Sequence, residues 1–224
     1  MKKNLDMTEG KPISLLWAFT FPTLMGNLLN QVYSITDSIV VGRYLGQTAL
    51  AAVGSTMPVI LLLAALMIGI NVGVGIIISR YFGQKNEELM RRAFVNSLYL
   101  GLFLSAGMMV MGLTFSGTIL RWMGTPDGPL QEATAYLEIS FITMICPLMY
   151  YLLSSAFRGL GDSQTALYCL IVSVLSNIGL DVLFVAVFRW GVAGSAWATA
   201  LAQALSAEVA AVLLFHKYPM MRMR

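Results

Sequence analysis

Charged side chains are scarce in this sequence, and their scarcity excludes an ordinary soluble domain. They make up 11% of the 224 residues, whereas soluble globular domains carry roughly a quarter. Hydrophobic residues make up 58% of the chain, and the mean hydropathy is +0.75. A single core in a chain of this length cannot hide so much apolar surface from water. The composition therefore indicates a protein embedded in a lipid bilayer.

Histidine and cysteine are nearly absent, which excludes several kinds of chemistry. The chain has one histidine, His216, and two cysteines, Cys146 and Cys169, both within apolar runs. This supply provides no disulfide framework and no metal-ligand spacing. No nucleophile stands beside a base in a pattern that would predict an enzyme. The net charge of +3 reflects where the basic residues lie along the chain and gives no reason to expect nucleic-acid binding.

What the sequence does contain is a series of long apolar segments, each able to cross a bilayer as a helix of roughly 20 residues. Continuous runs without alternation favour helices over a β-barrel. We therefore predict an all-α membrane protein, a bundle of six transmembrane helices in residues 13–215. The six segments are 13–41, 48–79, 92–118, 133–157, 164–188 and 191–215.

The basic residues predict the orientation of these segments. With six spans, both termini lie on one side of the membrane, and that side carries eleven of the fourteen lysines and arginines. Because basic loops stay in the cytoplasm, we expect both termini and the loops near 80–91 and 158–163 to be cytoplasmic. Residues 1–12 are interpreted as a cytoplasmic tail and not as a signal peptide. The expected location is a bacterial inner membrane.

Three of the segments carry polar stripes at helical spacing. Such faces must point at protein or water, because a bare polar group in hydrocarbon is costly. Two of the stripes contain a carboxylate. The stripes are Asn27, Asn30, Ser34 and Asp37 in the first segment, Ser173, Asn177 and Asp181 in the fifth, and Ser195, Thr199 and Gln203 in the sixth.

The two carboxylates, Asp37 and Asp181, need an explanation. A charged side chain at the centre of a membrane helix costs on the order of 2.5–3.5 kcal/mol. The predicted spans hold no lysine or arginine that could pair with either aspartate. A bound proton or a hard cation such as Na⁺, which prefers oxygen ligands, would remove this cost. The structural alternative is hydrogen bonding that only holds the helices together.

Helix-breaking and small residues are also placed within the spans. Pro22, Pro58 and Pro147 lie inside predicted helices and can kink them. Gly69 and Gly73 form a GxxxG pair, a spacing that favours close helix packing, and Gly75 follows two residues later.

Several stretches of the chain resemble the multidrug and toxic compound extrusion family of transporters. The resemblance covers nearly the whole chain. Its most specific stretches are "FPTLMGNLLNQVYSITDSIVVGRYLGQTALAAVG" (21–54), "SNIGLDVLF" (176–184) and "GVAGSAWATALAQ" (191–203), with "SRYFGQKN" (79–86) and "AFRGLGDSQTA" (156–166) between them.

The resemblance implies an activity and a site. Members of this family export organic cations and other toxic compounds in exchange for Na⁺ or H⁺. They have twelve helices in two lobes, with the substrate cavity between the lobes. The family's cation site in the first lobe falls here on Asp37, Asn177, Asp181 and Thr199. Tyr33 matches a cavity-lining tyrosine, and we expect Asn30 and Gln203 to line the substrate cavity with it.

The chain holds one lobe of the two that the resemblance implies. Residues 216–224 fall where a linker to the second lobe would begin, so the expected partner is a second six-helix lobe, either in the same protein or in another copy. Two alternatives remain open. One is a non-transporting membrane subunit that acts in assembly. The other is a lipid-linked oligosaccharide flippase, which is expected to have a strongly cationic cavity. No cofactor is expected apart from the coupling Na⁺ or H⁺.

Overall fold

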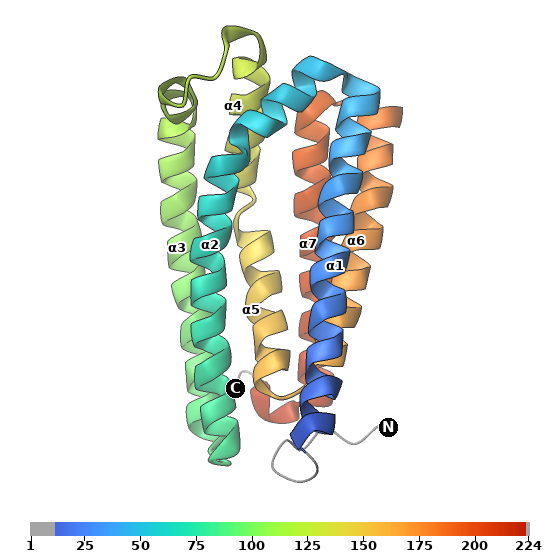
Figure 1. Cartoon of the computed structure of the whole chain (residues 1–224). Coiled ribbons are helices and arrows are strands. Elements are labelled where there is room, and N and C mark those ends of the chain that lie inside the picture. Colours follow the sequence, from blue (N-terminus) through green and yellow to red (C-terminus); the bar gives the residue numbers. More distant parts are fainter. Residues whose placement is uncertain (1–11, 223–224) are drawn as a thin grey trace.

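The computed structural model describes residues 12–222, so all but the last residue of the predicted tail, residues 1–12, lies outside the described part of the chain. Within that part the chain is almost entirely helical (Figure 1). The elements are α1 (Pro12–Leu45), α2 (Gln47–Gly83), α3 (Glu87–Trp122), α4 (Asp127–Ile142), α5 (Ile145–Gly159), α6 (Ser163–Asp181), the π-helix η1 (Val182–Val187), α7 (Gly191–Lys217) and the 3₁₀-helix η2 (Pro219–Met221).

Each of the six predicted segments is helical, which confirms the all-α class. Four helical stretches are long and apolar enough to span a bilayer: α2, α3, α6 continued by η1, and α7. The bent pair α4 and α5 forms a fifth if it is counted as one span. α1, with 34 residues, is not among these stretches. Its polar stripe faces α6 and α7, as described below.

The fourth predicted segment is broken near its middle. α4 ends at Ile142, α5 begins at Ile145, and the two axes differ in direction by 49°. Pro147 explains the position of the break. Its ring has no N–H to bond the carbonyl four residues earlier, at Thr143, and would clash with that carbonyl in a regular helix. Pro22 and Pro58 lie within continuous helices instead.

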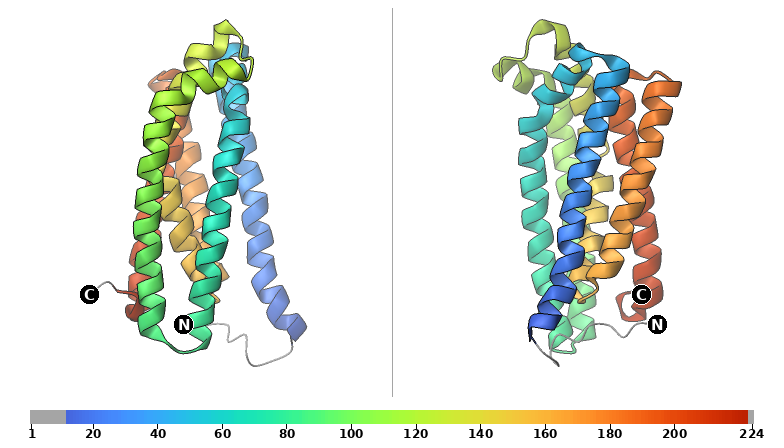
Figure 2. Two further views of the ribbon diagram at one scale, coloured as in Figure 1. Left: turned by 90° about the vertical axis from the view of Figure 1, so that its left-hand side faces the viewer. Right: turned by 45° about the vertical axis from the view of Figure 1, so that its right-hand side comes forward.

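The helices form two groups that meet along α5 and α7. α2 runs beside α3, and α1 runs beside α6, in both Figure 1 and Figure 2. α1 makes its most extensive contact with α6, and it diverges from α2 toward the end of the bundle where α1 begins. That end also holds the α2–α3 and α5–α6 connections and the end of α7. This is the arrangement expected for six spans whose basic loops share one side.

α2 and α5 cross at close range. The Ser155 hydroxyl donates a hydrogen bond to the backbone carbonyl of Asn71. A Cβ atom on Gly75 would lie 2.9 Å from the Ser155 Oγ, and one on Gly159 would lie 2.9 Å from the Gly75 carbonyl oxygen. Gly69 and Gly73 have open space where a Cβ would stand. The packing glycine of this stretch is therefore Gly75, and the GxxxG pair is not part of the crossing.

Residues 217–221, at the end of α7 and in η2, pack against the rest of the lobe. Lys217 Nζ donates to Asp162 Oδ2 at 2.5 Å, and the Tyr218 hydroxyl donates to the same oxygen at 3.2 Å. Asp162 caps α6 by accepting the backbone N–H of Thr165 at 3.1 Å. Tyr218 and Met221 are buried. These contacts hold the end of α7 and η2 against the start of α6.

The Asp162 contact gives the stability of the lobe an acid dependence. Burial opposes the charge of Asp162, but the hydrogen bonds from Lys217 and Thr165 outweigh it, so the pKa of Asp162 lies below its usual value of 3.8. Because the folded pKa is lowered, the stabilisation is complete above pH 3.8 and is lost as the pH falls through the folded pKa.

We expect Lys217→Met to lower the free energy of unfolding by about 1 kcal/mol at neutral pH, since solvent screens the half-exposed lysine. The loss should shrink below about pH 4, where the unfolded state keeps Asp162 protonated. Unfolding by added sodium dodecyl sulfate, followed by circular dichroism, measures both values. Arg80→Met removes a charge at the same end of the bundle and serves as the control. An equal loss in both variants would contradict the role of the Asp162 contact.

Candidate functional site

The three polar stripes of the sequence come together where α1, α6 and α7 meet. Asp37 lies in the C-terminal half of α1, Asp181 is the last residue of α6, and Ser195 and Thr199 lie in the first turns of α7. Asn177 and Asp181 are one turn apart on the same face of α6, and both are buried. The helical spacing that defined each stripe therefore brings all three into one polar cluster.

The two carboxyl groups occupy the centre of this cluster. The side chain of Asp37 lies next to that of Asp181. The Ser195 hydroxyl donates a hydrogen bond to Asp37 Oδ1 at 2.6 Å. Asp181 is completely buried, and neither of its oxygens accepts a hydrogen bond from a donor in the described part of the chain. Two adjacent carboxylates in a buried site repel each other strongly. Either a cation lies between them, or one of the two binds a proton.

Thr199 connects α7 to the other two helices. Its Oγ1 accepts a hydrogen bond from Asn177 Nδ2 at 3.4 Å and forms a second hydrogen bond, 3.0 Å long, with the Tyr33 hydroxyl. The Asn177 amide nitrogen is thereby turned toward Thr199. Its carbonyl oxygen, Oδ1, is buried and has no hydrogen-bond donor among the described residues.

Buried acceptor oxygens without donors are the most informative feature of the cluster. Buried polar atoms are nearly always hydrogen-bonded, so each exception calls for an explanation. In residues 12–222 the exceptions are Asn71 Oδ1, Asn177 Oδ1, both oxygens of Asp181 and Gln203 Oε1. Three of the five belong to one turn of α6. Oxygen atoms of carboxylates and amides are the ligands that hard cations prefer. The donor set therefore suits Na⁺, and the carboxyl pair suits a proton equally well.

The helix changes its hydrogen-bonding pattern directly after Asp181. The π-helix η1 follows at Val182–Val187. Segments of π-helix are rare and occur often at functional sites. Phe184 of η1 stacks on Trp190, with ring centroids 4.7 Å apart. Asp181 thus lies at the junction between the regular helix α6 and the π-helix that contributes Phe184 to this aromatic pair.

A cavity of about 150 Å³ lies on the far side of Thr199, between α2, α4, α5 and α7. Its wall combines thioether, phenol and amide groups, and the break between α4 and α5 forms part of it. The polar and polarisable side chains in this wall are Met67, Tyr136, Ser140, Thr143, Met144, Tyr151, Thr199 and Gln203. We call it the central cavity. Gln203, predicted to line a substrate cavity, is in its wall.

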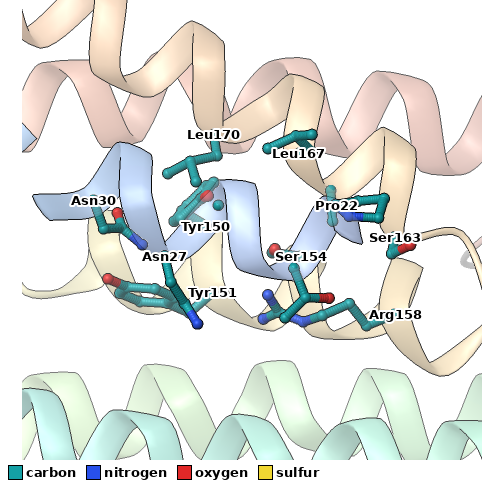
Figure 3. Close-up of a pocket in the computed structure, with 13 residues that line it drawn as sticks. Pro22, Asn27, Asn30, Tyr150, Tyr151, Ser154, Arg158, Ser163, Leu167 and Leu170 are labelled. Atoms are coloured by element: carbon teal, nitrogen blue, oxygen red, sulfur yellow. The ribbon is translucent and has the colours of Figure 1, made fainter. Parts of the chain in front are cut away.

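A second, smaller pocket of about 60 Å³ lies between α1, α5 and α6 (Figure 3). We call it the α1–α5–α6 pocket. Asn27 and Asn30 of α1 line it, and so do Tyr150, Tyr151 and Arg158 of α5. The two residues predicted to share a cavity, Asn30 and Gln203, therefore line different pockets. Tyr33 is in the wall of neither pocket, and its hydroxyl is hydrogen-bonded to Thr199.

Sequence reasoning did not predict the surroundings of three residues of these sites. Ser195 belongs to a predicted stripe, but its bond to Asp37 joins residues 158 positions apart and has no local signal. Tyr136 of α4 lies near both aspartates, which its place in an apolar segment did not indicate. Arg158 was assigned to a cytoplasmic loop, whereas it is in the last turn of α5 and lines the α1–α5–α6 pocket.

Comparison with known proteins places the chain in a family. The sequence model of the MatE family matches residues 22–183. The probable multidrug resistance protein YoeA of Bacillus subtilis is 36% identical over 203 residues, which is 87% of this chain and 44% of that protein. The multidrug export protein MepA of Staphylococcus aureus is 28% identical over 96% of this chain and 47% of its own length. The chain spans about half the length of these curated relatives.

Solved structures show the same relation. A crystal structure of a MATE protein in the bent conformation superposes with a TM-score of 0.88 at 28% identity, over 97% of this chain and 48% of that one. A structure of a MATE protein in the straight conformation gives a TM-score of 0.87 at 27% identity. The described fold is thus that of one half of a MATE transporter. On the family match and these relatives together, the chain belongs to the MatE family of membrane transporters.

Proposed function

We propose that this chain is one lobe of a cation-coupled antiporter that exports small organic compounds, organic cations among them, in exchange for Na⁺ or H⁺. The observation that carries the proposal is the set of three buried, donorless oxygens of Asn177 and Asp181 next to the Asp37 carboxyl group. The names of the relatives, multidrug resistance and multidrug export proteins, support export of such compounds as the activity.

The geometry suggests how ion binding changes the lobe. Asp37 is on α1 and Asp181 is on α6, so two unneutralised carboxylates would push these helices apart. A cation or a proton between them removes the repulsion and draws α1 toward α6. α1 packs mainly on α6 and makes smaller contacts with α2 and α7, so a change between α1 and α6 acts on its largest contact. The ion can shift the lobe by no more than its difference in affinity for the two arrangements.

Thr199 provides a direct link between the ion and the substrate. Its side chain bonds Asn177 and Tyr33, and the same residue lines the central cavity. An ion that takes the Asn177 carbonyl oxygen as a ligand would reorient that amide, and Thr199 would have to adjust. We propose the central cavity as the substrate site of the lobe. The faces of Tyr136 and Tyr151 can attract an organic cation, and Met67 and Met144 can adapt to its shape.

A complete transport cycle needs a second lobe. Alternating access in such transporters is a movement of one bundle against another around a site between them. We propose that the partner is a second six-helix lobe, which another copy of this chain or a further segment of the same protein supplies. The structures that match over half of their length support a two-lobed assembly. Because the family consists of transporters, we propose that the chain is not an enzyme.

Dye export from proteoliposomes tests this function. We expect this chain, reconstituted together with a second lobe, to move ethidium against the ethidium gradient when a Na⁺ or pH gradient is imposed. Asp37→Asn should lower the initial rate at least 10-fold, because it removes one of the two carboxylates. Glu208→Gln, which changes an exposed carboxylate on α7, should leave the rate unchanged.

Export by Asp37→Asn at the wild-type rate under both gradients would refute the coupling role. A non-transporting assembly subunit predicts a different result. In that case neither gradient moves the dye, and Asp37→Asn and Asp181→Asn change the stability of the lobe without changing ion binding.

A further inference from the structure

Arg158 is a solvent-exposed cation in the wall of a pocket for which the proposed export mechanism gives no role. It belongs to the last turn of α5 and lines the α1–α5–α6 pocket. The described part of the chain contains two ion pairs, Arg92 with Glu88 and Lys217 with Asp162, and Arg158 takes part in neither. The carboxylate at this end of α6, Asp162, is occupied by Lys217 and Thr165. Among residues 12–222 the guanidinium thus has no acidic partner.

The surroundings of Arg158 favour an anion. Figure 3 shows its guanidinium beside Ser154, with Ser163 on the other side of the same end of the pocket. Both serines are buried and line the pocket. Ser163 is the first residue of α6, a helix of 19 residues. A guanidinium and hydroxyl groups are donors that bind carboxylates and phosphates.

The size of the pocket limits what it can hold. At about 60 Å³ it is smaller than the central cavity of about 150 Å³, so it suits a compact oxyanion group better than a whole drug molecule. The rest of such a ligand would extend past Tyr150 and Tyr151, whose rings lie farther along the same pocket (Figure 3). The occupant is thus an amphiphile with an acidic head and an apolar or aromatic body.

We propose that Arg158, Ser154 and Ser163 form an oxyanion subsite that binds the carboxylate or phosphate group of an amphiphilic molecule at the cytoplasmic end of the lobe. The inference deepens the proposed export function, and it rests on that function for the claim that the bound molecule is cargo. It adds acidic and zwitterionic compounds to the organic cations proposed for the central cavity. The acidic head has two sources, a soluble amphiphile or a lipid headgroup.

Fluorescence titration of the purified chain in a neutral detergent tests the subsite, with 2-naphthoate as the probe and its methyl ester as the neutral control. We expect the wild type to bind the acid at least ~10-fold more tightly than the ester, and Arg158→Gln to abolish that preference. Arg158→Lys should keep part of it, because lysine keeps the charge and loses the planar fork. Arg80→Gln, at the same end of the bundle, should not change it.

Three results would overturn the subsite: equal binding of acid and ester by the wild type, no binding of either, or an unchanged preference in Arg158→Gln. Asp181→Asn separates the two proposals, since we expect it to lose ion binding while keeping the preference for the acid. Native mass spectrometry from mixed phosphatidylcholine and phosphatidylglycerol nanodiscs identifies the source. Phosphatidylglycerol retained by the wild type and lost by Arg158→Gln indicates a lipid headgroup, and equal lipid retention with acid-selective binding indicates a soluble amphiphile.

Discussion

Replacing Asp181 with asparagine is expected to weaken binding of the coupling ion to the purified chain by roughly 100-fold, which corresponds to about 2.7 kcal/mol. Asp181 is completely buried, and its two oxygens have no donor in the described part of the chain. An amide of the same shape offers the ion one neutral oxygen in place of a charged pair. Equilibrium dialysis with ²²Na⁺ and potentiometric proton binding measure the loss for the two possible ions.

The matched control is Glu208→Gln, which makes the same chemical change at an exposed position of α7. We expect its ion binding to equal that of the wild type. Asp37→Asn should behave like Asp181→Asn, and the double variant should be little worse than either single variant, because the two carboxyl groups act as one site. Additive losses in the double variant would show two independent groups and would contradict a shared ion.

The second large effect concerns folding of the lobe. Gly112 of α3 is buried, and a Cβ atom there would lie 2.0 Å from Cγ of Phe141 on α4. Carbon atoms that are not bonded to each other do not approach so closely, so Gly112→Ala forces the helices apart or moves the buried phenyl ring. We expect it to lower the free energy of unfolding by about 3 kcal/mol, at the upper end of the usual cost of overpacking. Unfolding by sodium dodecyl sulfate measures this cost.

Gly107 provides the control, since it lies on the exposed side of the same helix with open space where a Cβ would stand. Gly107→Ala should leave the stability unchanged or raise it slightly, because alanine is the better helix former. Phe141→Leu combined with Gly112→Ala should recover part of the loss by making room. A loss in Gly112→Ala no larger than in Gly107→Ala would show that α3 and α4 do not pack as described.

The polar cluster was predictable because its signal is local. Asn177 and Asp181 are four residues apart, so helical geometry alone puts them on one face. The high cost of a carboxylate in hydrocarbon then requires that face to point inward. What no local pattern carries is which helices meet. The bond from Ser195 to Asp37 spans 158 positions, and the place of Tyr136 beside the aspartates depends on where α4 crosses α7.

The fold shows the same division between local and long-range features. The break between α4 and α5 follows from Pro147, whose missing N–H is readable from the sequence, although Pro22 and Pro58 do not break their helices. The choice of Gly75 over Gly69 for the helix crossing depends on the position of Ser155 and Gly159 on another helix. Arg158 was placed in a loop because charged residues mark span ends, and its pocket forms only when α1 and α6 pack against α5.

The central claim is that Asp37 and Asp181 hold one ion between them. A difference titration tests it most directly. It compares the number of protons bound by the wild type with the number bound by the Asp37→Asn/Asp181→Asn variant between about pH 5 and pH 9. Each protein is titrated with and without Na⁺. We predict that the wild type binds one more proton than the variant within this range. If Na⁺ is the coupling ion, adding Na⁺ should displace that proton. If H⁺ is the coupling ion, the proton should stay bound when Na⁺ is added. Identical titrations of the two proteins, with no effect of Na⁺ on either, would contradict the account.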